Sequence, residues 1–154
     1  MSSDCTFAYC TAENNWRASS LGLFGGEAHH AHHIAIYDGL EAGVRVNADF
    51  AGKGFSDKGQ IHLHDITIRH CGCKSGSRGK SGDFWGNMQG AFNIGSTANY
   101  DVRNIRAEDI DIYDTRSSAM YLRAASGHKL LNIILRNITI DRSEEHTSEL
   151  QSLA

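Results

Sequence analysis

Two carboxylates placed together can cleave a bond, one as acid and one as base or nucleophile, so the aspartates of this 154-residue chain are candidates for chemistry. Asp49 and Asp83 fall in predicted loops and are the catalytic candidates, although neither has a carboxylate partner beside it in the sequence. Asp38 and Asp114 each end an Ile-x-Ile-Tyr-Asp motif. This shared turn position favours hydrogen bonds to backbone amides. The sequence therefore offers isolated carboxylates and no assembled catalytic pair.

Four histidines, His29, His30, His32 and His33, raise the question of a metal site. Strand geometry sends successive side chains to opposite faces, so these residues do not converge unless a special turn brings them together. No cysteine or carboxylate lies beside them at a spacing typical of zinc sites. We therefore predict solvated histidines in a turn, with no metal and no cofactor.

The four cysteines give no recognisable framework. Cys71 and Cys73 are separated by one residue, which is too tight for a CxxC redox or zinc motif, and Cys5 and Cys10 add no pattern. One or two disulfides in a secreted protein and free thiols both remain open.

Four short segments read apolar-x-apolar and predict short strands at residues 21–23, 44–46, 92–94 and 120–122. In each segment the outer two side chains point inward by alternation and the middle one points outward. Stacked segments would form a first outward row of Gly22, Arg45, Asn93 and Tyr121, and a second outward row of Phe24, Asn47, Gly95 and Arg123. Such side chains suit a sugar chain, whose hydroxyls need fixed donors and acceptors and whose rings need flat apolar faces. An ordinary solvated surface is the alternative.

A repeat indicates how these segments are positioned. Residues 34–46 and 110–122 align without a gap, and both read I-x-I-Y-D, five residues, then apolar-x-apolar. Three further segments share the first half of this pattern. The equivalent positions are Cys10, Ile34, Ile66, Ile110 and Ile138, separated by 24, 32, 44 and 28 residues.

Short strands that alternate in this way cannot bury their apolar faces alone, but stacking one repeat on the next creates a continuous interior. The chain has no proline and 16 glycines, as expected of stacked strands joined by tight turns. We predict an all-β, right-handed parallel β-helix of about five coils, truncated at both ends. A β-sandwich is the rival fold, but it gives no reason for the shared register.

Composition sets further limits. With 40% hydrophobic residues, 21% charged residues and a net charge of −3, the chain suits a soluble domain, and neither nucleic acid nor a membrane is a predicted partner. No signal peptide opens the sequence, so the protein is either cytosolic or lacks its true N-terminus.

Residues 142–152 match the translation of a common sequencing-library adapter residue for residue. We therefore divide the chain into a β-helix fragment of a catalytic domain, residues 1–141, and a non-native tail, residues 142–154.

The segments 16–26, 42–50 and 85–91, together with the I-x-I-Y-D turns, resemble the mycodextranase and α-1,3-glucanase family of β-helical glycoside hydrolases. The resemblance covers most of residues 4–141. It implies a secreted, monomeric bacterial enzyme that hydrolyses internal α-1,3-glucosidic bonds in glucans by an inverting mechanism.

The family's catalytic groups are one aspartate and, about a coil later, an adjacent Asp-Asp pair. This sequence has no Asp-Asp pair, so the resemblance transfers no catalytic role and places the catalytic aspartates upstream of Met1. We therefore expect the isolated chain to be inactive. The candidate sugar contacts are Trp16, Arg17, Arg45, Asp49, Trp85 and Asn87.

Two other functions fit the same scaffold. A polysaccharide lyase could use Arg45 or Arg123 as its base, but the sequence shows no acidic cluster for the calcium ion that such chemistry needs. A non-catalytic β-helical adhesin or carbohydrate-binding protein would bind glycans without cleaving them. Fold alone does not separate these functions.

Overall fold

The computed structural model describes residues 4–15, 19–25, 28–47, 59–72, 90–95, 100–124 and 127–143. Within these ranges the regular structure is entirely β-strand, arranged in two parallel sheets. No helix in this described part is long and apolar enough to cross a membrane.

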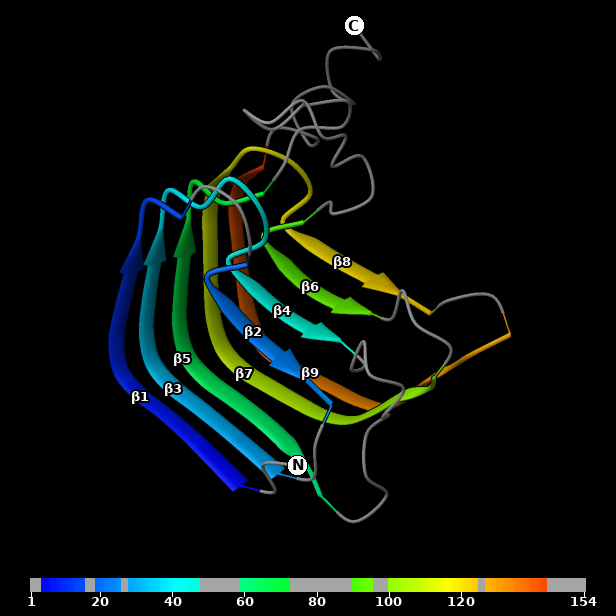
Figure 1. The fold of residues 1–154 in the computed structure, drawn as a ribbon. Coiled ribbons are helices and arrows are strands. Elements are labelled where there is room, and N and C mark those ends of the chain that lie inside the picture. The colour runs from blue at the N-terminus through cyan, green and yellow to red at the C-terminus, as the bar shows by residue number, and fades with distance from the viewer. Residues whose placement is uncertain are drawn as a thin grey trace, which may run out of the picture.

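Sheet A is made of long strands and sheet B of short ones, and the chain alternates between them (Figure 1). Sheet A contains β1 (Asp4–Glu13), β3 (Ala28–Tyr37), β5 (Ile61–Arg69), β7 (Val102–Thr115) and β9 (Leu130–Ser143), in that spatial order. Sheet B contains β2 (Leu21–Phe24), β4 (Val44–Asn47), β6 (Phe92–Gly95) and β8 (Met120–Arg123), also in that order. Each coil thus adds one strand to each sheet, which defines a parallel β-solenoid.

The register of sheet A confirms the repeat read from the sequence. Cys10 pairs with Ile34, Ile34 with Ile66, Ile66 with Ile110, and Ile110 with Ile138. The unequal spacings therefore fall in the connections between strands, while the strands keep their alignment.

The core lies between the two sheets and is built from equivalent apolar residues of successive coils. Ile36, Ile66 and Ile110 from sheet A are at most 1% exposed, as are Val46 and Phe92 from sheet B. These side chains form one continuous apolar cluster. Burial of this kind holds successive coils together, because one strand alone, such as β5 with its four inward residues, cannot form a core.

Each long strand bends part way along its length (Figure 1). The bend occurs at one non-glycine residue per coil whose φ is positive, a conformation in which Asn, Asp and His are enriched. This bend column consists of Tyr9 (φ 54°), His33 (52°), Asp65 (53°), Asp109 (52°) and Asn137 (49°). Alternation restarts after the bend, so in β3 and β5 inward residues stand two apart in each arm and three apart across the bend, as Ala31 and Ile34 do.

A second column of left-handed residues follows at the ends of the long strands. Asp38 (φ 56°) and Asp114 (φ 50°) belong to it, which confirms their shared turn position. Asp38 Oδ1 lies 3.2 Å from His70 Nδ1, a hydrogen bond between coils, and Asp114 Oδ2 forms an ion pair with Arg69 Nε over 3.3 Å. These aspartates thus bind side chains of neighbouring coils.

The side chains of Cys5, Cys10 and Cys71 are in the thiol form, while Cys73 lies outside the described residues. Burial raises the pKa of the Cys71 thiol.

Strand β9 continues through Ser143, whose backbone pairs with Thr115. The last two residues of this strand therefore come from the segment that the sequence analysis interprets as a non-native tail.

Candidate functional site

The register of sheet B confirms the alignment of the first outward row and of two pairs in the second. Gly22 pairs with Arg45, Arg45 with Asn93, and Asn93 with Tyr121, which aligns the first outward row. In the second outward row, Phe24 pairs with Asn47, and Gly95 pairs with Arg123. The sequence therefore predicts which of these residues are neighbours within the printed pairs of sheet B.

The two rows are not evenly accessible. Arg45 and Asn93 are only 6% and 7% exposed, and Asn47 is also buried. Phe24 is 39% exposed at one end of sheet B, and Arg123 is exposed at the other end, where its guanidinium lies 3.5 Å from the Tyr121 hydroxyl. The surface available to a ligand is thus concentrated on β2 and β8.

Arg45 is held between a carboxyl group and an aromatic ring. Its guanidinium carbon lies 6.0 Å from the centre of the Phe24 ring, and the charge of Glu41 acts on it. Glu41 is only 3% exposed, and its Oε1 has no hydrogen-bond partner among the described residues. Burial raises the pKa of Glu41, although the Arg45 charge opposes that rise. Glu41 is a buried titratable group beside the first outward row, and the sequence interpretation missed it.

Of the predicted sugar contacts, Arg45 alone falls within the described ranges. Trp16, Arg17, Asp49, Trp85 and Asn87 lie outside the described residues, as does the catalytic candidate Asp83. Their predicted roles stay predictions.

The prediction that the histidines occupy a turn is wrong. His29, His30, His32 and His33 lie in strand β3, in the arm before the bend and at the bend itself. His29 faces the core and its Nε2–H donates to the Gly25 carbonyl oxygen over 3.1 Å. The other three lie on the outer side of sheet A, where the next coil supplies two more imidazoles.

His30, His62 and His64 form a histidine cluster in which one ligand atom of each residue lies within 4.8 Å of the others. The rings of His30 and His62 stack at 5.2 Å with an interplanar angle of 5°. His30 Nε2 lies 2.8 Å from His64 Nε2, a hydrogen bond that needs one ring to donate and the other to accept.

Carboxylates on both sides orient the histidine cluster. His64 Nδ1 lies 2.6 Å from Asp65 Oδ2, and His62 Nε2 lies 3.2 Å from Glu108 Oε2. The histidine ring beside Asp65 lowers the pKa of that carboxyl, mainly through this hydrogen bond. Desolvation, followed by the charges of His32 and His64, lowers the pKa of His30. The carboxylates are thus ionised and His30 is neutral near pH 7.

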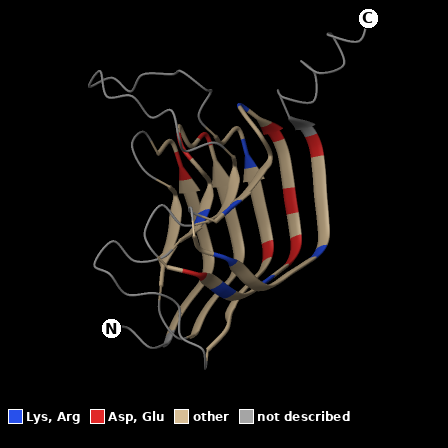
Figure 2. Cartoon of the chain, turned by 90° about the vertical axis from the view of Figure 1, so that its right-hand side faces the viewer, with Lys and Arg blue, Asp and Glu red and all other residues tan. Residues whose placement is uncertain are grey.

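The surroundings of the cluster are balanced in charge. Acidic and basic positions both occur along the long strands (Figure 2). Arg106 on β7 pairs with His62 on β5, and its Nε–H donates to Glu108 Oε2 over 2.6 Å. Glu108 therefore offsets the nearest cation while also accepting from His62.

The repeat contained the signal for this cluster. With Ile34 aligned to Ile66, His30 falls beside His62, and His32 falls beside His64. The expectation of divergence considered one strand at a time, whereas parallel stacking brings side chains from adjacent coils within contact distance.

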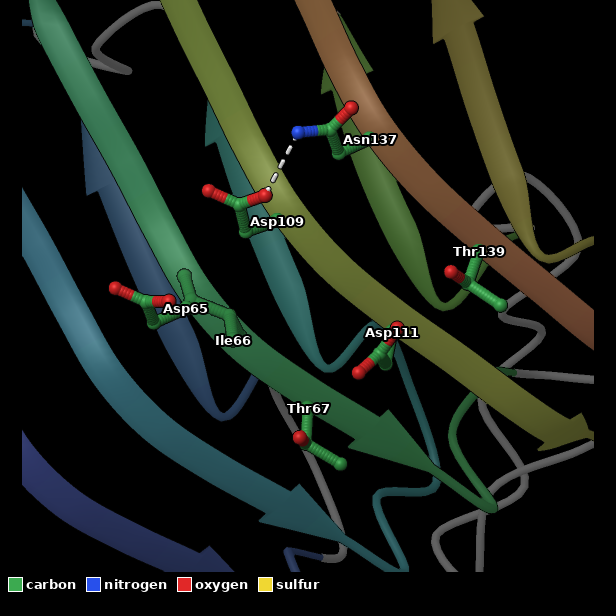
Figure 3. A pocket seen from close by; sticks show the side chains of 7 residues that line it. All are labelled: Asp65, Ile66, Thr67, Asp109, Asp111, Asn137 and Thr139. Carbon is green, nitrogen blue, oxygen red and sulfur yellow. Dashed lines mark hydrogen bonds between the residues drawn. The ribbon is translucent and has the colours of Figure 1, made fainter.

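A shallow hollow of about 380 Å³ lies just beyond the cluster, on the outer side of the bend (Figure 3). Carboxylates of Asp65, Asp109 and Asp111 line it, together with Thr67, Ile66, Asn137 and Thr139. Asn137 Nδ2 donates to Asp109 Oδ1 over 2.9 Å, so part of this polar lining is used between coils.

No family model, curated protein or solved structure is similar enough to this chain to count as a match. A proposal for the function therefore rests on the fold and on the residues described above.

Proposed function

We propose that this chain is the substrate-binding part of a secreted, monomeric glycoside hydrolase with a right-handed parallel β-helix fold, acting on α-1,3-glucosidic bonds by an inverting mechanism. The observation that supports it is the alignment of the two outward rows on sheet B. The rows place an aromatic ring on each outermost strand and an exposed guanidinium, that of Arg123, beside one of them, and such groups suit the ring faces and hydroxyls of a linear sugar polymer.

The accessible ends of the rows favour an oligomeric ligand over a single sugar. Phe24 on β2 and Tyr121 on β8 belong to the outermost strands of sheet B, three strand spacings apart. At 4.7–4.9 Å per spacing, the two strands stand about 14 Å apart. A polysaccharide laid across sheet B would meet the Phe24 ring at one end and the Tyr121 ring at the other, with Arg123 as a hydrogen-bond donor beside Tyr121.

The buried members of the rows have a supporting role in this proposal. Arg45 lies under the Phe24 ring and interacts with the charge of Glu41, so it supports one face of that ring. Glu41 receives no catalytic role, because a carboxyl that is 3% exposed does not reach a bound sugar. The proposal places the catalytic carboxylates outside this chain, since the sequence contains no adjacent aspartates.

Binding of the whole chain to insoluble α-1,3-glucan tests the proposal, measured as depletion from solution. We expect depletion for the unmodified chain and at least about tenfold weaker binding for Phe24→Ala or Tyr121→Ala, since each removes a stacking face. Tyr113→Ala is the matched control, because Tyr113 lies on sheet A and contacts Arg69. Absence of binding, or equal loss in the control, would contradict the proposal.

Products distinguish the proposal from its alternatives. The chain expressed with its flanking coding sequence should release glucose oligomers of inverted anomeric configuration from α-1,3-glucan. Unsaturated products from pectin would instead identify a polysaccharide lyase. Binding without cleavage of either polymer would identify a non-catalytic adhesin or carbohydrate-binding protein.

A further inference from the structure

We propose that the histidine cluster, His30, His62 and His64, binds one divalent transition-metal ion on the outer face of sheet A and so links strands β3 and β5. The site lies on a different sheet from the outward rows. It stands or falls independently of the carbohydrate proposal.

The geometry of the three imidazoles carries the inference. One ligand atom from each lies within 4.8 Å of the other two, and each side chain is half-buried. Zinc–nitrogen bonds of about 2.0–2.1 Å in a tetrahedron place ligand nitrogens about 3.3 Å apart. His30 Nε2 and His64 Nε2 are 2.8 Å apart without a metal, so these two atoms need to separate by only about half an ångström. The His30 and His62 rings are stacked at an interplanar angle of 5°, so one of these two rings must also turn for both lone pairs to reach the same ion.

The carboxylates supply the orientation that metal-binding histidines usually have. A ligating imidazole typically donates its other N–H to a carboxylate, which fixes the tautomer and the ring. His64 has this arrangement: Nδ1–H donates to Asp65 Oδ2 over 2.6 Å and leaves the lone pair of Nε2 toward His30. Glu108 accepts from His62 in the same way, over 3.2 Å.

The chemistry of the ligands selects the class of ion. Neutral imidazole binds Zn²⁺, Cu²⁺ and Ni²⁺ well, whereas Mg²⁺ and Ca²⁺ prefer oxygen ligands. Three histidines leave a fourth position open, as in zinc sites that keep a water. The side chains of His62 and His64 are 34% and 23% exposed, so an ion can reach the cluster from solution.

The three ligands come from two coils, since His30 is on β3 and His62 and His64 are on β5. A bound ion would therefore cross-link the coils and stabilise the folded state over the unfolded one. The chain should melt at a higher temperature with Zn²⁺ than after treatment with a chelator.

Calorimetric titration of Zn²⁺ into the whole chain, purified without a histidine tag and stripped with chelator, tests the site. We expect one ion per chain, and about 100-fold or greater weakening in His30→Gln and His62→Gln. Asp65→Asn keeps a residue suited to the bend and should weaken binding about 10- to 100-fold. Metal-free melting temperatures of the variants should stay close to that of the parent chain, which separates lost ligands from lost folding.

A second group, His33, His64 and Asp65, also has its ligand atoms within 4.8 Å and provides the discriminating control. His33→Asn suits the left-handed position of residue 33 and removes that group alone. We expect it to leave the affinity unchanged, as should His70→Asn in the second column. Absence of binding, or loss in His33→Asn with retention in His30→Gln, would overturn the proposal.

Discussion

Asn137 donates its side-chain amide to Asp109 over 2.9 Å, and both residues occupy the same left-handed position in successive coils. The contact joins β7 to β9 outside the backbone ladder. It shows how a short polar side chain can serve two purposes, since Asn137 adopts the bend and also bonds to the equivalent residue of the neighbouring coil.

Asp109→Asn should be tolerated, and Asp109→Val should not. Asparagine adopts positive φ readily and keeps an oxygen that can accept from Asn137, whereas a β-branched side chain is strained at φ 52°. We expect Asp109→Val to lower the free energy of unfolding by about 1–3 kcal/mol and Asp109→Asn by much less. Urea denaturation followed by circular dichroism measures both, and equal losses would argue against the role of the bend.

Ile110→Ala should be among the more damaging single changes. Ile110 is fully buried between Ile66 and Ile138 in the register, so truncation leaves a cavity inside the stack. We expect a loss of about 2–5 kcal/mol in the free energy of unfolding. Ile140→Ala on the last strand is the control, because Ile140 is 47% exposed and should cost far less.

The strand stacking was predictable because its signal is repeated. Alternating apolar residues in five segments place Ile34, Ile66, Ile110 and Ile138 in one layer, and the structure has them in register. The bend was not predictable from alternation, because one left-handed residue such as Asp65 interrupts the period of two. The signature of the bend is one extra residue between inward positions: two residues, where alternation would have one, separate Leu63 from Ile66.

The candidate sites were predictable to different degrees. The partners of Arg45 along its row follow from register alone, but its burial depends on how the coil packs, which register does not give. The histidine cluster needed comparison between coils, since His30 and His62 are 32 residues apart in the sequence and adjacent in the sheet. Side-chain chemistry therefore has to be read down the stack as well as along the chain.

Gly95→Ala should weaken the pairing of β6 with β8. A methyl group at Gly95 would lie 2.6 Å from the carbonyl oxygen of Arg123, and a backbone atom cannot move aside without disturbing the ladder. We expect a loss of about 1–3 kcal/mol in the free energy of unfolding. In the control Gly22→Ala, the added methyl meets the outer edge of the Phe24 ring, which can rotate, so a smaller loss is expected.

Glu41→Gln should stabilise the protein at pH 7 and have little effect below pH 4. Burial raises the pKa of Glu41 above its ordinary value of 4.5, so the folded state binds this proton more tightly than the unfolded chain does. That contribution is fully present below about 4.5 and is lost as the pH rises through the folded pKa, because the buried carboxylate is then charged. Glutamine stays neutral at every pH and avoids the loss.

Urea denaturation of the unmodified protein and of Glu41→Gln across this pH range measures the difference in the free energy of unfolding, which should grow as the pH rises.

Asp101→Asn should show the opposite dependence of stability on pH. Hydrogen bonds from the Lys129 amide and from Arg103 lower the pKa of Asp101, so its contribution is present above its ordinary pKa and disappears as the pH falls through the lowered one. A stability difference for Glu41→Gln that is constant with pH would show that the carboxyl does not change charge in this range, and that its burial beside Arg45 is compensated.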